Sequence, residues 1–255
     1  MTVAEYISYF LKKNSVKSIF MLTGYGAMYL NDAIKKSGIK YYATRNEATA
    51  PIMAEAYSRV TGKVGVACVT AGPGATNAIP GLAEAYVDSA PILVISGQVD
   101  YKQTTNSTKL KDIRTFGTAE IDIIPIVKPL TKYCKILKNP NDVDYVFNKA
   151  IDVATSGRPG PVWIDIPLNV QRSKIDLSKL KKYKKKEKKL IKKEDLNKIL
   201  KSLNASKRPL IICGGGIKSS KTFKILKKII NLKNIPTFFS RAASDLCSHD
   251  DKFIF

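Results

Sequence analysis

The stretch 44–77, TRNEATAPIMAEAYSRVTGKVGVACVTAGPGATN, constrains the fold more than any other part of the chain. Its first half places apolar side chains at the helical positions i, i+3, i+4 and i+7: Ala50, Met53, Ala54 and Tyr57. Gly62 is a stop signal for that helix, and residues 64–69 are a continuous apolar run, typical of a buried parallel strand. Residues 72–77, GPGATN, carry few bulky side chains and lead into a second helix through Ala83. In open parallel sheets, ligands bind beyond the carboxyl end of such a strand.

The first 170 residues repeat this alternation of strand and helix. Thr2 and Glu5 form a predicted capping box at the start of the first helix. Further helices are predicted at residues 28–36, 119–127 and 142–155, and further strands at 16–22, 39–43, 91–97 and 161–167. This order predicts a protein of the α/β class, with a parallel sheet in a flavodoxin-like three-layer domain over residues 1–170.

The composition changes after this region. Residues 171–193 are polar and rich in lysine, which predicts an interdomain linker that trypsin should cut first. Residues 194–255 then begin a second α/β unit, with helices at 194–203 and 223–232 and strands at 209–213 and 235–239. The glycines at 214–216 indicate a tight turn, since the spacing of a dinucleotide-binding loop is not kept. About sixty residues hold too few strands for a complete doubly wound sheet.

Composition narrows the function classes. The net charge of +22 suggests nucleic acid or an anionic surface, but much of it lies in residues 179–193, and base-stacking features are missing, so we do not expect nucleic-acid binding. The four cysteines are widely spaced, which favours free thiols and a cytoplasmic location. We expect no signal peptide and no membrane span. His249 is the only histidine, so neither a Ser-His-Asp triad nor a histidine-rich metal site is predicted.

Three motifs together resemble a known family. Glu47 stands in an N-E-x-x-A-x-x-x-A-E-A-Y-x-R-x-T-G frame, which is followed by G-P-G-A-T-N and then by I-S-G-Q ending at Gln98. Their order and spacing resemble the pyrimidine-binding domain of thiamine-diphosphate enzymes, in the branch of the acetolactate synthase-like large subunits. The resemblance covers residues 2–170, and residues 194–255 resemble the start of the Rossmann-like central domain of the same family.

The resemblance implies roles for particular residues. Glu47 would hydrogen-bond N1′ of the cofactor's aminopyrimidine, which requires a carboxyl group kept protonated by apolar surroundings. Gln98 would be a second active-site residue that orients substrate. The remaining cofactor contacts would come from two glycine-containing loops: Thr23, Gly24, Gly72, Pro73, Gly74 and Asn77. From the residues alone, Glu47 is also explained by the dipole of a helix that begins there, and 72–77 by a turn with a helix cap.

Some features depart from the family. Asn46 precedes the acid where histidine is common, and residues 22–27 and 117–120 differ from biosynthetic acetolactate synthases. Residues 22–27 are closer to variants of sugar pathways. Family members also hold the diphosphate and Mg²⁺ on a further domain, whose Gly-Asp-Gly … Asn motif these residues lack. We therefore expect weak thiamine-diphosphate binding by this chain alone, without Mg²⁺ dependence, and predict no metal site.

The resemblance leaves several functions open. The chain would serve an enzyme that decarboxylates a small 2-oxo acid and transfers the fragment to a carbonyl acceptor, as a homodimer or homotetramer. A split enzyme, with the diphosphate domain on a separate chain, a non-catalytic product that keeps a dimerisation surface, and a sugar-pathway carboligase are the alternatives. Whether FAD is bound is left open.

Overall fold

A computed structural model describes residues 1–108, 110, 112–185, 191–248 and 250–254. The chain divides into two compact units, Met1–Lys185 and Lys186–Phe255, and each is described by itself. The predictions made for His249 and for residues 186–190 lie outside the described residues. In the described parts of the chain, no helix combines the length and the apolar character needed to cross a membrane.

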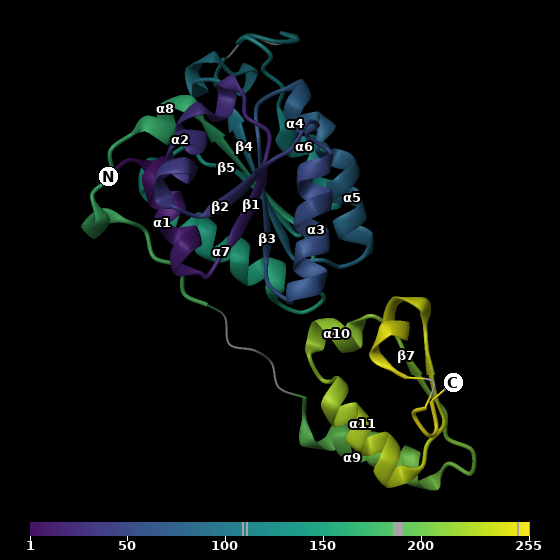
Figure 1. The fold of residues 1–255 in the computed structure, drawn as a ribbon. Coiled ribbons are helices and arrows are strands. Elements are labelled where there is room, and N and C mark those ends of the chain that lie inside the picture. The colour runs from purple at the N-terminus through teal and green to yellow at the C-terminus, as the bar shows by residue number, and fades with distance from the viewer. Residues whose placement is uncertain (109, 111, 186–190, 249, 255) are drawn as a thin grey trace. The chain divides into compact units, whose positions relative to one another are not determined.

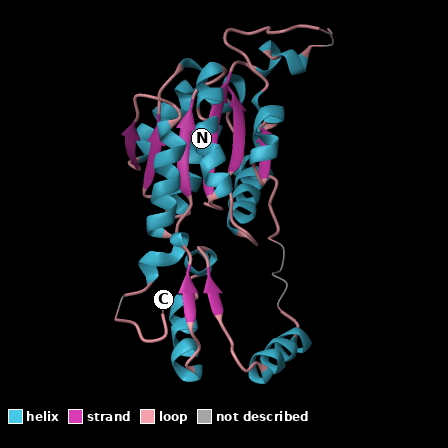
Figure 2. Ribbon diagram, turned by 90° about the vertical axis from the view of Figure 1, so that its right-hand side faces the viewer, coloured by secondary structure: helices cyan, strands magenta, loops and turns pink. Residues whose placement is uncertain are grey.

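Within its described residues, the first unit is built on a sheet of six parallel strands (Figure 2). The strands are β1 (Ser18–Met21), β2 (Lys40–Ala43), β3 (Gly65–Val69), β4 (Ile92–Gln98), β5 (Tyr133–Ile136) and β6 (Val162–Pro167). Their order is β2-β1-β3-β4-β6-β5, so the prediction of a parallel α/β sheet is confirmed. The order reverses between β1 and β3, which makes the carboxyl ends of these two strands the switch point of the sheet.

Helices cover both faces of this sheet and complete the three layers (Figure 1). The α-helices of the described first unit are α1 (Val3–Lys13), α2 (Met28–Ser37), α3 (Thr49–Thr61), α4 (Pro73–Asn77), α5 (Ile79–Val87), α6 (Ile123–Val127), α7 (Val143–Thr155) and α8 (Leu168–Arg172). α1, α2 and α7 contribute to the core on one face, with Phe147 among its largest buried side chains. α3, α5 and α6 contribute to the core on the other face, around Trp163.

The local signals in the sequence explain these elements. Thr2 and Glu5 form the predicted capping box of α1, with Thr2 N donating to a Glu5 carboxylate oxygen over 2.7 Å. α3 buries Ala50 and Ala54 and ends at Gly62, which has a left-handed φ of 64°. All residues of β3 are buried, as expected for a central parallel strand.

The structure differs from the predicted elements at several places. Residues 73–77 form the short helix α4 instead of the predicted loop, because Pro73 stands at its first position, where no amide donor is needed. The helix predicted at 119–127 begins only at Ile123, because the Asp122 side chain accepts from Ile124 N and caps it there. The edge strand β5 is not predicted by the apolar pattern, since the exposed Lys135 interrupts it.

The first unit extends beyond the domain boundary predicted at residue 170. Residues 173–185, here called the strap, continue along it: Ile175 and Leu180 are buried in its core, and Ile175 N donates to the carbonyl of Met1 over 3.1 Å. These two apolar side chains, spaced within a polar segment, explain why the chain stays on the unit. The wider division into domains and linker stays a prediction.

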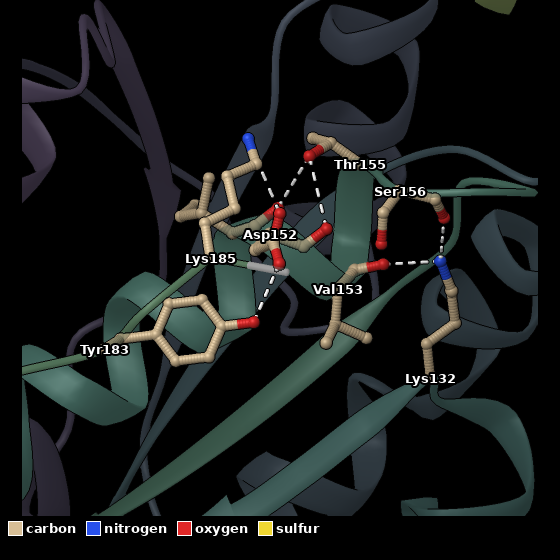
Figure 3. A network of polar contacts seen from close by, with 8 residues as sticks. Lys132, Asp152, Val153, Thr155, Ser156, Tyr183 and Lys185 are labelled. Atoms are coloured by element: carbon tan, nitrogen blue, oxygen red, sulfur yellow. Dashed lines mark hydrogen bonds and ion pairs between the residues drawn. The ribbon is translucent and has the colours of Figure 1, made fainter. Parts of the chain in front are cut away.

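The end of the strap lies against α7. The Tyr183 hydroxyl donates to Asp152 over 2.7 Å, and Lys185 Nζ lies 3.5 Å from the other carboxylate oxygen of Asp152, as Figure 3 shows. Lys182 pairs with Asp144 at 3.6 Å in the same way. At the end of α7, Lys132 donates to the carbonyls of Val153 and Ser156 (Figure 3). Lys182 and Lys185, which the sequence predicts to be solvated, therefore hold the strap to acidic residues of α7.

Asp152→Ala is expected to loosen the end of the strap. The variant removes one hydrogen bond to a carboxylate and one partly exposed ion pair, together about 1–2 kcal/mol. The open state should rise roughly fivefold to thirtyfold, so trypsin should cut after Lys182 and Lys185 faster by that factor. Limited proteolysis with mass spectrometry measures this, with Asp32→Ala, which removes the Asp32–Lys36 pair on α2, as the control. Equal cutting rates in both variants would contradict the strap contacts.

The second unit is smaller and carries a two-stranded parallel sheet in its described residues. Its elements are α9 (Lys193–Ala205), β7 (Ile211–Cys213), α10 (Gly216–Ser220), α11 (Phe223–Lys233) and β8 (Thr237–Phe239). This matches the predicted order, and the glycines after β7 form a tight turn into α10. None of the α9 side chains is buried, so this helix adds nothing to the hydrophobic core of the second unit.

Candidate functional site

The residues singled out in the sequence lie at the carboxyl edge of the sheet in the first unit. Thr23 and Gly24 follow β1, Glu47 follows β2, and residues 72–77 follow β3. Gln98 is the last residue of β4. Three of these four segments surround the switch point between β1 and β3, which is where open α/β sheets bind ligands.

Glu47 lies in the turn before α3, and its carboxylate is held by one neighbour. Asn77, at the end of α4, donates from Nδ2 to Glu47 Oε2 over 2.7 Å. The same amide reaches Asn46 Oδ1 at 3.3 Å, and that oxygen also accepts from Ala48 N at 2.8 Å. Asn46 thus fixes the turn that presents Glu47. Because Glu47 precedes the helix, it is not the first-turn acid that the dipole explanation required, and α3 has no acid in its first turn.

Thr70 brings the glycine loops around Glu47 together. A Cβ added to Gly24 would lie 2.5 Å from Thr70, and one added to Gly74 would lie 2.5 Å from Thr70 Cγ2 and 3.1 Å from Glu47 Oε1. The Thr70 hydroxyl also accepts from Gly26 N at 3.1 Å. Any larger residue at position 24 or 74 would push these segments apart, so the glycines are needed for close backbone packing beside the carboxylate.

Gly72 connects the same loop to the segment before α6. Its φ of 57° with ψ of −125° is a backbone conformation that side chains rarely adopt, and an added Cβ would collide with the carbonyl oxygen of Ala119. Pro73, which follows it, is exposed and opens α4. Thr23 is also exposed.

Gln98 lies in a separate polar cluster below the surface. Only 2% of its surface is exposed, and its amide nitrogen donates to the carbonyl of Ile121 over 2.9 Å. The same nitrogen lies 3.4 Å from a carboxylate oxygen of Asp165, and Gln98 Oε1 accepts from Val99 N at 3.0 Å. The side chain that resembles a substrate-facing glutamine is therefore fully engaged within the first unit.

The structure thus brings the predicted residues together in two groups. Glu47, Gly24, Gly74 and Asn77 meet around Thr70, whereas Gln98 pairs with residues of β6 and of the segment before α6. Sequence reasoning missed Thr70 and Gly81. A Cβ on Gly81 would lie 2.8 Å from Ile52 N, so Gly81 lets α5 pack closely against the start of α3, next to Glu47. A polar residue directly after a buried strand was the available signal for Thr70.

Comparison with known proteins identifies the class. Residues 1–124 match the model of the thiamine pyrophosphate enzyme N-terminal TPP binding domain. Over these residues the chain is similar to the thiamine pyrophosphate enzymes, and the fold of the first unit, with a parallel sheet between two helical layers, is consistent with their flavodoxin-like TPP-binding domain.

Curated relatives narrow the branch. The chain is 37% identical over 241 residues to an acetolactate synthase large subunit of Buchnera aphidicola, which covers 91% of this chain. It is 34% identical to a probable acetolactate synthase large subunit of Methanocaldococcus jannaschii and 38% identical to an acetolactate synthase large subunit of Lactococcus lactis, over 92% and 89% of this chain. The chain is therefore homologous to acetolactate synthase large subunits. It spans 40%, 39% and 38% of the length of these three relatives.

Proposed function

We propose that the first unit holds the aminopyrimidine of thiamine diphosphate at Glu47, as part of an acetolactate synthase-like enzyme. The observation that carries the proposal is the 2.7 Å hydrogen bond from Asn77 to Glu47 at the switch point of the sheet. It lies inside the region that matches a TPP-binding domain. Gly24, Gly72, Pro73, Gly74 and Thr23 belong to the loops that would face the cofactor.

The chemistry of Glu47 and its neighbours fits this group. Asn77 engages Glu47 Oε2, while Oε1 lies beside Gly74, where the absence of a side chain permits close approach of a flat ring. Glu47 would share a proton with the ring nitrogen N1′, and Asn77 would keep the carboxyl group oriented toward it. Thiamine diphosphate, when bound, supplies an acidic carbon and an electron sink for a 2-oxo acid.

The reaction of the whole protein is proposed from its relatives. We infer decarboxylation of a small 2-oxo acid and transfer of the fragment to a carbonyl acceptor, with Gln98 near the substrate. A sugar-pathway carboligase is the alternative that residues 22–27 favour. A split or non-catalytic chain is the other alternative.

A protein partner would cover the exposed apolar surface of α3 and α5. Ile52 and Val60 of α3 are 39% and 87% exposed, and Tyr86 and Val87 at the end of α5 are 45% and 71% exposed. Large apolar side chains on two adjacent helices favour a protein–protein contact over solvent. A second copy of the chain is the partner we propose, and a separate chain that carries the diphosphate-binding domain is the alternative.

Titration of the whole chain with thiamine diphosphate tests the binding site. We expect weak binding, with amide chemical-shift changes at Glu47, Gly74 and Asn77, because the exposed Asn77 and half-buried Glu47 contact the ring from one side only. Asn77→Ala should abolish these changes by removing the donor to Glu47. Asn148→Ala, which removes an amide donor on α7, is the matched control. Changes confined to Gly214–Gly216 would contradict the proposal.

A further inference from the structure

One face of the sheet in the first unit becomes polar at its carboxyl edge. Ile92 and Val94 of β4 and Trp163 of β6 belong to the core beneath α3, α5 and α6. Side chains alternate along a strand, so the following residues of the same face are Ser96, Gln98 and Asp165. Of these three polar residues, the proposed function uses only Gln98.

Asp165 lies at the centre of this polar end. It is 2% exposed, and the Ser96 hydroxyl donates to its Oδ1 over 2.6 Å. The indole of Trp163 donates to the oxygen of Ser96 over 2.8 Å. An indole nitrogen can only donate, so the Ser96 hydroxyl hydrogen is left free to point at Asp165.

The backbone partners of the Gln98 amide identify which of its two atoms is the oxygen and which is the nitrogen. Val99 N can only donate, which identifies the amide oxygen, and the Ile121 carbonyl can only accept, which identifies the amide nitrogen. The second hydrogen of that nitrogen then faces Asp165 Oδ2 at 3.4 Å. Asp165 therefore receives donors on both oxygens, an arrangement that suits an ionised carboxylate.

We propose that Asp165 is a positioning residue whose ionised carboxylate holds the Gln98 amide with its nitrogen turned inward. In this orientation Gln98 can offer only the second lone pair of its oxygen. When Asp165 takes up a proton, the inward hydrogen of Gln98 keeps only a neutral carboxyl oxygen as acceptor, and a hydrogen bond to a neutral group is weaker than one to a carboxylate. The amide is then held less tightly, by the Val99 and Ile121 backbone groups and a weaker contact to Asp165. The consequence for substrate orientation rests on the proposed function of Gln98.

Burial and the neighbouring charges bring the protonation of Asp165 close to neutral pH. Burial raises the pKa of Asp165 from 3.8 to about 7, the hydrogen bonds from Ser96 and Gln98 oppose that rise, and the acidic neighbours Asp122 and Glu120 add to it. The folded protein thus binds this proton more tightly than the unfolded chain does. Its stability should fall as pH rises from about 4 to about 7 and then stay level.

Side-chain amide signals of the whole chain, labelled with ¹⁵N-glutamine, test the proposal without cofactor. The sequence has three glutamines, and Gln171 is a built-in control, because its buried amide donates to the carbonyls of Gly26 and Ile166 instead of a carboxylate. We expect one Gln98 amide hydrogen to shift downfield with a midpoint near pH 7, while Gln171 stays constant. In Asp165→Asn, the Gln98 signal should become independent of pH between about 5.5 and 8.5.

Two further measurements keep the test decisive. If Asp165→Asn does not fold, the carboxyl ¹³C shift of Asp165 in the unmodified chain still reports its titration, which must coincide with that of Gln98. Asp122→Asn retains the cap of α6 and should lower the midpoint by removing one acidic neighbour. A Gln98 signal that does not titrate, or that titrates unchanged in Asp165→Asn, would overturn the proposal. Neither result depends on thiamine-diphosphate binding, which the titration above tests separately.

Discussion

Glu47→Gln is expected to slow hydrogen–deuterium exchange at C2 of bound thiamine diphosphate by ~10²–10⁴-fold while the chain stays folded. Glutamine has the volume of glutamate and can still accept the hydrogen bond from Asn77 that the structure shows at 2.7 Å. It cannot share an acidic proton with N1′, so the activating contact is lost while the local packing is kept. The measurement requires the chain together with a protein part that holds the diphosphate and Mg²⁺.

The control for this variant is Glu84→Gln, an exposed glutamate on α5. It makes the same chemical change without touching the proposed site, and exchange should continue at the unmodified rate. Far-UV circular dichroism establishes that both variants are folded. Gln98→Ala should slow exchange less than Glu47→Gln, because Gln98 is proposed to act on substrate. A folded Glu47→Gln variant that binds the cofactor and exchanges at the normal rate would remove the proposed role of Glu47.

The elements of the first unit were predictable because they rest on local patterns. The continuous apolar run of β3 is buried in full, and the helix from Thr49 to Thr61 ends at the glycine that the sequence marks as its stop. A parallel sheet buried on both faces requires such runs, so the fold class follows from their spacing. The position of Glu47 after β2, at the carboxyl edge, follows from the same pattern.

The contacts within the site could not be predicted in this way, because they join segments far apart in the sequence. Thr70 meets Gly24 and Gly74 only because β1 and β3 are neighbours in the sheet. The pairing of Gln98 with Asp165 requires β6 to lie next to β4, an order that the spacing of strands does not specify. The sequence predicts a linker over the strap because Ile175 and Leu180 are isolated apolar residues in a polar segment. Only the folded unit shows that they pack into its core.

The first unit leaves Glu47 only half buried, so a further surface would have to cover it. The exposed apolar residues of α3 and α5 lie on the helices that also carry or contact the site, since α3 follows Glu47 directly and Gly81 of α5 packs on its start. A partner on that surface would therefore contact the two helices whose first turns pack next to Glu47. This connects the proposed oligomer to the proposed chemistry through a short, defined set of contacts.

Gly72→Ala is expected to cause the largest loss of stability among glycine substitutions in the loops around the site. The backbone at Gly72, with φ of 57° and ψ of −125°, would cost an alanine roughly 1–3 kcal/mol. The collision of the new methyl group with the Ala119 carbonyl adds about 1–3 kcal/mol of overpacking, because that atom is backbone and cannot rotate away. The total of roughly 2–6 kcal/mol is a large fraction of the stability of a domain.

Gly157→Ala is the control for the cost of placing a side chain at positive φ. Gly157 has nearly the same φ, 58°, but an added Cβ would meet nothing within 4 Å, so only the conformational cost of about 1–2 kcal/mol applies. Urea unfolding followed by the fluorescence of Trp163, the only tryptophan and fully buried in the first unit, reports on this unit alone. Because α4 starts directly after Gly72, the forced shift should also separate Asn77 from Glu47. Equal losses in the two variants would mean that the Ala119 segment yields freely and does not fix the loop beside the carboxylate.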